Sequence, residues 1–152
     1  MLFRSDPSIH ASAVLVGARA LLIRGPSGSG KSRLTLSLLQ AANRGALPFA
    51  RLVADDRCHL EAVNGRLLVR PAEVLAGMIE VHGLGLRGLP YEPVAVVSSV
   101  IELGAISAAR MPELSEQWAD LEGVRLPRLA VAAGHDPLQM VLAYLRTAAV
   151  PT

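Results

Sequence analysis

A short apolar run followed by a glycine-rich loop constrains this chain more than any other feature. Residues 21–24 read Leu-Leu-Ile-Arg, and residues 25–32 read Gly-Pro-Ser-Gly-Ser-Gly-Lys-Ser. The second segment fits the phosphate-loop pattern G-x-x-x-x-G-K-[ST] at every constrained position. The apolar run is typical of a buried strand, and the apolar spacing after the loop predicts a helix that ends near Gly45. A strand, a phosphate loop and a helix are therefore expected here.

The residue types in the loop suit a polyphosphate ligand. Glycines let the backbone approach phosphate oxygens closely, and the loop amides with the first turn of the helix point at an anion. Lys31 is the only lysine among 15 cationic residues, and its ammonium can reach the outer phosphates. A glycine-rich turn that binds nothing is the alternative, and we favour nucleotide binding because motif and context agree. The predicted nucleotide-binding residues are Gly25, Pro26, Ser27, Gly28, Ser29, Gly30, Lys31 and Ser32.

Composition narrows the classes of protein to which the chain can belong. With 152 residues, 51% of them hydrophobic and 3% aromatic, it is expected to form one domain over residues 1–152 with an aliphatic core. The net charge of +2 is small, and no basic cluster predicts nucleic-acid binding. No apolar segment reaches the ~20 residues that span a bilayer. The single cysteine, Cys58, excludes an internal disulfide and favours a reducing, cytoplasmic setting.

Carboxylates follow two further apolar segments. Asp55 and Asp56 come directly after residues 51–54, which read as a second buried strand. Acidic residues at such a strand end are where phosphate-loop proteins hold Mg²⁺ or place a catalytic carboxylate, although an ordinary acidic turn is the alternative. Glu80 lies within an apolar strand just before flexible glycines. A carboxylate there must be paired, hydrated or bound to a cation.

The other elements follow from local patterns, and together they predict an α/β fold. Asn64-Gly65 between two apolar runs predicts a hairpin. The glycines at 83, 85 and 88 match a dinucleotide fingerprint only formally, because Pro90 and Pro93 exclude the helix that such a fingerprint must open. Further predicted elements are one helical turn in 71–76, a central strand over 94–103, a helix within 113–120, a strand over 125–133 and a helix from Pro137 to about Ala149.

Four features in this order resemble the catalytic domain of the bacterial HPr kinase/phosphorylase family. They are His10, the phosphate loop, the Leu-Val-Ala-Asp-Asp segment at 52–56 and the Ile-Glu-Val-His-Gly-Leu-Gly segment at 79–85. The resemblance is to the shorter members, and it implies a phosphate-loop-containing mixed β-sheet with flanking helices, related to phosphoenolpyruvate carboxykinase. It also implies ATP- and Mg²⁺-dependent phosphorylation of a serine on HPr, the small phosphocarrier of the sugar phosphotransferase system. Reverse phosphorolysis and a homo-oligomer, commonly a hexamer, belong to the same family pattern.

The resemblance also assigns roles to single residues. Lys31 and the loop amides hold the β- and γ-phosphates, and Ser32 ligates Mg²⁺ with help from Glu80. One of Asp55 and Asp56 takes the serine proton; the family pattern favours Asp56 as the base, which leaves Asp55 with the metal. Two further active-site residues are implied, His10 and the catalytic arginine Arg110.

The chain departs from the family pattern at three places. His82 stands where arginine is usual, and Arg33 stands where an acidic residue is common. Residues 130–136, Ala-Val-Ala-Ala-Gly-His-Asp, replace a basic segment that the family links to dephosphorylation, so kinase activity is expected to exceed phosphorylase activity. Two alternatives stay open at this point, namely a phosphate-loop kinase of small molecules and a non-catalytic module that senses ATP.

Overall fold

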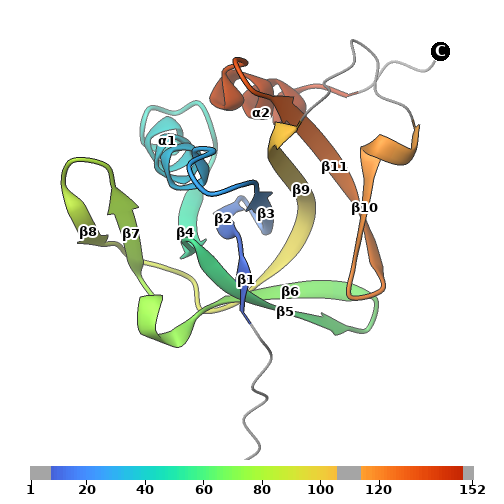
Figure 1. Ribbon diagram of the computed structural model, residues 1–152, viewed down its shortest axis with the longest axis horizontal. Coiled ribbons are helices and arrows are strands. Elements are labelled where there is room, and N and C mark those ends of the chain that lie inside the picture. The colour runs from blue at the N-terminus through green and yellow to red at the C-terminus, as the bar shows by residue number, and fades with distance from the viewer. Residues whose placement is uncertain (1–7, 106–113, 149–152) are drawn as a thin grey trace, which may run out of the picture.

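The computed structural model describes residues 8–105 and 114–148, which form a curved sheet with two helices packed on one side (Figure 1). The strands are β1 (Ile9–His10), β2 (Ser12–Val16), β3 (Arg19–Arg24), β4 (Ala50–Ala54), β5 (Arg57–Val63), β6 (Arg66–Pro71), β7 (Met78–Val81), β8 (Gly85–Gly88), β9 (Ala95–Ala105), β10 (Trp118–Leu121) and β11 (Val124–Ala132). The α-helices are α1 (Lys31–Asn43) and α2 (Pro137–Arg146), and two 3₁₀ turns cover Glu73–Leu75 and Leu114–Gln117.

The long strand β9 organises a sheet of nine strands. The order along the main path is β1-β5-β6-β9-β3-β2-β4, and β11, which carries β10, also pairs with β9. Strands β3 and β11 run parallel to β9. Strand β6 pairs antiparallel with the first residues of β9. The carboxyl ends of β3, β9 and β11 therefore meet at one edge, which is where the phosphate loop begins.

Apolar side chains cover both faces of this sheet. Leu21 and Ile23 on β3 pack towards the helices with Leu38 of α1 and Val141 of α2. Leu22 belongs to a second cluster on the opposite face, which β5, β6, β10 and β11 cover where the sheet curves round (Figure 1). A strand that is buried on both faces reads as an unbroken apolar run, as residues 20–23 do.

Both helices begin where the sequence predicts, and α1 also ends there, whereas α2 ends at Arg146 and not near Ala149. Helix α1 buries Leu34, Leu38 and Ala41 at helical spacing and stops at a turn in which Gly45 takes φ 80°, a left-handed conformation that glycine favours. Asp136 caps α2, because its side chain accepts a hydrogen bond from the Leu138 amide at 3.0 Å, and Pro137 occupies the first turn. Neither helix, nor any other in the described part of the chain, is long and apolar enough to cross a membrane.

Three segments differ from the sequence predictions. The helix expected within 113–120 is wrong: the 3₁₀ turn Leu114–Gln117 leads directly into strand β10, which pairs with β11 around the turn at 122–123. Residues 9–16, for which no strand is predicted above, form β1 and β2. The glycine cluster at 83–88 supplies the turn and the second strand of the β7–β8 hairpin, which stands to one side of the large sheet (Figure 1).

Candidate active site

The phosphate loop connects β3 to α1 and closes over the end of β9. Gly30 caps the helix with φ 98°, a conformation open mainly to glycine. At Gly25 the constraint is space, because an added Cβ would lie 2.5 Å from Ser29 Oγ and 2.9 Å from the carbonyl oxygen of Leu103. The Ser29 amide donates to the Pro26 carbonyl at 3.0 Å and tightens the loop. The glycines thus let the loop fold closely against the end of the parallel sheet.

The Lys31 ammonium lies within the loop that precedes it. Its Nζ donates to the carbonyl oxygens of Gly25 at 2.9 Å and Pro26 at 3.2 Å, and the residue is only 8% exposed. An ammonium has three donors, so these two contacts leave one for an anion. The arrangement holds a positive charge against the backbone of the loop.

Asp55 links the loop to three other segments. Its Oδ1 accepts hydrogen bonds from the Ser32 hydroxyl at 2.7 Å and the Ser12 hydroxyl at 2.9 Å, and its Oδ2 accepts from the Glu80 amide at 3.1 Å. Asp55 is 5% exposed. The phosphate-loop serine and a strand-end aspartate therefore touch, which is the pairing that holds Mg²⁺ in phosphate-loop enzymes.

Asp56 is placed quite differently from its neighbour. It takes the left-handed conformation at φ 69°, and its side chain is 58% exposed, whereas Asp55 is buried. His10 Nδ1 lies 3.9 Å from Asp56 Oδ1, and His10 Nε2 lies 3.1 Å from a guanidinium nitrogen of Arg57. Pairing of β1 with β5 sets His10 opposite Arg57, and the Ala11 amide donates to the Asp56 carbonyl at 3.1 Å.

The remaining predicted residues are only partly brought to this site. The Glu80 amide donates to Asp55, but its carboxylate is exposed on β7 and makes no hydrogen bond or ion pair with another described residue. Within the described ranges, no group of three or more His, Cys, Asp or Glu side chains is arranged to hold a metal ion. Arg110 lies outside the described residues, in the gap between 105 and 114.

Sequence reasoning missed two residues that complete the arrangement. Ser12 is fully buried, bonds Asp55 and accepts the Asp56 amide at 3.1 Å. Arg57 holds His10 and also donates to Ser8 at 3.1 Å. The available signal was weak: a serine between Ala11 and Ala13 in an apolar run, and an arginine directly after two aspartates.

Comparison with known proteins places the chain in a family. The sequence pattern of the HPr Serine kinase C-terminal domain matches residues 3–89. The chain belongs to the HPr kinase/phosphorylase family. It is 32% identical over 115 residues to the HPr kinase/phosphorylase of Clostridium beijerinckii, covering 76% of this chain, and 32% identical over 135 residues to that of Streptococcus thermophilus, covering 82%. It spans 34% and 41% of these two relatives' lengths.

The HPr kinase fold is also found among solved structures. The Hpr(Ser) kinase/phosphatase from Coxiella burnetii aligns with a TM-score of 0.73 at 23% identity, over 93% of this chain and 95% of that one. This match confirms the predicted fold class, a mixed sheet with flanking helices in the HPr kinase architecture. At 23% identity, this structural similarity establishes a shared fold and nothing more.

Proposed function

We propose that this chain is the catalytic module of an ATP-dependent protein kinase that phosphorylates a serine of an HPr-type phosphocarrier protein. The observation that carries the proposal is the 2.7 Å contact between Ser32 of the phosphate loop and the buried Asp55. It joins the phosphate site to the strand end where exposed Asp56 and His10 lie. Such an arrangement suits phosphoryl transfer, which depends on positioning and charge neutralisation more than on covalent chemistry.

Nucleotide binding is assigned to residues 25–32. The loop amides and the Lys31 ammonium would hold the β- and γ-phosphates, since that ammonium already lies against the loop carbonyls. The hard oxygen ligands of Ser32 and Asp55 fit Mg²⁺, which takes few protein ligands and completes its shell with phosphates and water. When bound, Mg²⁺ neutralises charge on the phosphates. Glu80, whose backbone adjoins Asp55, is the proposed assisting carboxylate.

The two aspartates divide the work in this proposal. Asp55 accepts three hydrogen bonds and is buried, so it is suited to orienting Ser32 and the metal. Asp56 is exposed beside His10 and is suited to receiving the substrate. In the step, the serine oxygen bonds to the γ-phosphorus as the bond from that phosphorus to the ADP oxygen breaks. Asp56 accepts the serine proton, and His10, held by Arg57, orients the base.

Exposure of the base favours a protein substrate over a small metabolite. Both Asp56 and His10 have side chains more than half exposed, at 58% and 64%, so a serine on a protein surface can reach them directly. Relatives of this family are named for HPr, and we infer the same class of partner here. A homo-oligomer and a cytoplasmic setting follow from the same family pattern. Arg110 keeps its inferred role of neutralising charge on the transferring group.

We further propose that forward transfer dominates over phosphorolysis. The last residues of β11 and the turn after it carry Ala-Val-Ala-Ala-Gly-His-Asp at 130–136, which lacks the lysine and arginine that would bind a second phosphate. Incubation with phosphoserine-HPr and inorganic phosphate should therefore release little pyrophosphate. Rapid release of unmodified HPr with pyrophosphate would contradict this part of the proposal.

The decisive experiment uses labelled ATP, Mg²⁺ and the HPr-type carriers of the host, with mass spectrometry to find the modified side chain. The native chain should yield phosphoserine, and Asp56→Asn should lower the rate by about 10²–10⁴-fold with ATP affinity unchanged. Asp120→Asn is the matched control, since Asp120 is exposed on β10 and, among the described residues, is paired only with Arg125 at 3.1 Å. ATP binding without any phosphoserine would instead identify a nucleotide sensor, and transfer to a metabolite would identify a small-molecule kinase.

A further inference from the structure

Arg57, the first residue of β5, meets His10 across a strand pair. Strand β1 pairs antiparallel with β5, which sets His10 opposite Arg57. The next pair, Ile9 opposite Cys58, packs into the apolar cluster. Residues that face each other on paired strands share one side of the sheet, and side chains alternate along a strand. The side chains of His10 and Arg57 therefore lie on the opposite, outer side of the sheet.

The contact between these two side chains selects one form of the His10 ring. A guanidinium nitrogen of Arg57, Nη2, lies 3.1 Å from His10 Nε2. A guanidinium stays protonated and has donors only, so Nε2 must accept through its lone pair. A neutral imidazole carries a single ring hydrogen, which is then on Nδ1. Arg57 thus favours the Nδ1–H tautomer, whereas a neutral histidine without a partner favours the Nε2–H tautomer.

The Nδ1–H tautomer presents a donor to Asp56. His10 Nδ1 lies 3.9 Å from Asp56 Oδ1, a distance longer than a hydrogen bond. Contacts of this kind are often long before the substrate arrives, and they shorten in the reacting complex. With the hydrogen on Nδ1, the ring and the carboxylate attract each other. In the other tautomer a lone pair of Nδ1 would face the carboxylate oxygen, and the two would repel.

The guanidinium of Arg57 is itself held in position. Its Nη1 donates to the Ser8 hydroxyl at 3.1 Å, so both terminal nitrogens have a partner. The Arg57 amide donates to the Asp55 carbonyl at 2.8 Å, and the Arg57 carbonyl accepts from the Ala72 amide at 3.3 Å. These bonds fix the start of β5 directly after the two aspartates. The side chain therefore reaches His10 from a backbone that is bonded on both sides.

We propose that Arg57 is a positioning residue, which holds His10 in the Nδ1–H tautomer so that a donor faces Asp56. The catalytic meaning of this contact rests on the proposed function, in which Asp56 accepts the serine proton. A donor on Oδ1 orients the carboxylate and leaves Oδ2 to accept that proton. Arg57 acts through His10 and needs no contact with ATP or with the transferring phosphoryl group.

Nitrogen-15 nuclear magnetic resonance of the native chain tests the tautomer without any substrate. Spectra are recorded at pH about 8.5, where an ordinary histidine is neutral, and His10→Gln identifies the His10 signals among the four histidines. In the native chain Nδ1 should carry the hydrogen and Nε2 should not. Arg57→Met keeps an unbranched side chain but has no donor, so Nε2–H should become the main form. Arg57→Lys retains a donor and should keep more of the Nδ1–H form than Arg57→Met.

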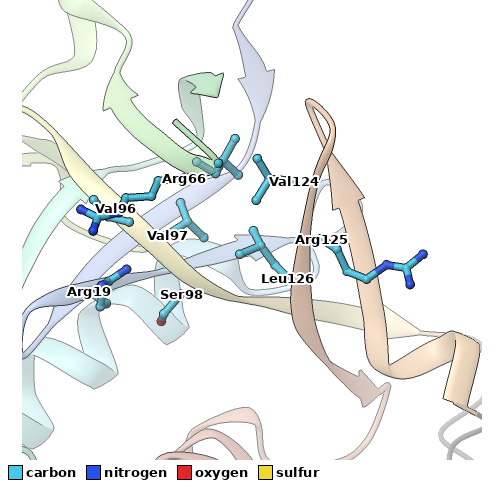
Figure 2. Close-up of a pocket in the computed structure, with 10 residues that line it drawn as sticks. Arg19, Arg66, Val96, Val97, Ser98, Val124, Arg125 and Leu126 are labelled. Atoms are coloured by element: carbon cyan, nitrogen blue, oxygen red, sulfur yellow. The ribbon is translucent and has the colours of Figure 1, made fainter. Parts of the chain in front are cut away.

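Arg125→Met is the matched control for these variants. Arg125 is exposed on β11 and bonded to Asp120 at 3.1 Å, and Figure 2 shows its side chain pointing away from Val97. This variant should leave the His10 tautomer and the phosphotransfer rate unchanged. Unaltered amide signals outside β1 and β5 would show that the Arg57 variants are folded.

Phosphotransfer separates this proposal from the proposed function. With ATP, Mg²⁺ and the HPr-type carriers, Arg57→Met should lower the rate at least tenfold, while ATP affinity stays the same. The proposal is overturned if native His10 carries its hydrogen on Nε2, if Arg57→Met leaves the tautomer as it is, or if it reverses the tautomer without slowing transfer. A tautomer that changes as expected, in a chain that modifies no serine, would support the contact between Arg57 and His10 and would overturn the proposed kinase function instead.

Discussion

Replacement of Asp55 offers the sharpest test of how the site is held together. Its carboxylate is 5% exposed and accepts from two hydroxyls, at 2.7 and 2.9 Å, and from one amide at 3.1 Å. Asp55→Ala removes both acceptor oxygens, and with them three hydrogen bonds, and it leaves the Glu80 amide and the Ser12 hydroxyl without this acceptor. At about 1 kcal/mol or more for each lost bond, the free energy of unfolding should fall by about 3 kcal/mol. For a chain of this size that is a drop in Tm of roughly 6–12 °C.

Asp55→Asn separates this structural role from the charge of the carboxylate. The amide can keep its oxygen towards the Glu80 N–H while its NH₂ donates to the two serine hydroxyls, which can turn to accept. We expect the free energy of unfolding to fall by about 1 kcal/mol, within the usual value of a hydrogen bond. Phosphotransfer should still drop at least 100-fold, because the negative charge beside Ser32 is lost.

Urea unfolding and phosphotransfer assays on both variants check these values. An Asp55→Ala variant as stable as the native chain would refute the inferred bonding. An Asp55→Asn variant with full Mg²⁺-dependent transfer would refute the role of the charge. Asp120→Asn, an exposed carboxylate in a surface pair, should change stability by less than about 1 kcal/mol and should transfer phosphate normally.

Three further perturbations probe the loop and the core. Lys31→Met should weaken ATP binding at least tenfold in calorimetry, since it removes the ammonium beside Gly25; equal affinity would exclude its phosphate contact. Gly25→Ala should also weaken ATP binding about tenfold, because the new Cβ would lie 2.9 Å from a backbone oxygen. Gly65→Ala places its Cβ in open space and should leave ATP binding unchanged. Burial raises the pKa of the Cys58 thiol from 9.0 to about 12, so the folded chain keeps a proton that the unfolded chain loses. The free energy of unfolding should therefore fall by up to about 1.4 kcal/mol per unit as pH rises from 9 towards 12. In urea unfolding, the free energy of unfolding of the native chain should fall more steeply with pH than that of Cys58→Ala. Identical pH slopes for the two chains would contradict this.

Elements set by local chemistry were predictable from the sequence. The phosphate loop needs glycine, lysine and serine at fixed spacing, Asn64-Gly65 dictates its own turn, and Asp136 with Pro137 starts a helix. All three are where the sequence places them. The positions of Asp55 and Asp56 after β4 follow in the same way from one apolar run ending in two acids.

Features that depend on distant pairing were not predictable. Nothing local in residues 118–121 distinguishes the strand β10 from a helix, because the pairing with β11 decides it. The insertion of β2 between β3 and β4 likewise comes from tertiary packing. Asp55 and Asp56 differ in burial and in partners because Asp56 has a φ of 69° and because Asp55 is bonded by buried Ser12. Ser12 lies 43 positions from Asp55 in the chain.

The contact between Ser32 and Asp55 has a consequence for how a cation would arrive. An ionised carboxylate can only accept, so the Ser32 hydroxyl must donate its hydrogen to Asp55. Its lone pairs are then aimed in a fixed direction before any metal is present. A hydroxyl without this hydrogen bond would lose rotational freedom when it coordinates a metal. The Ser32 hydroxyl has already lost that freedom when the chain folds. If the proposed Mg²⁺ site exists, part of its affinity for the ion would therefore be set when the chain folds.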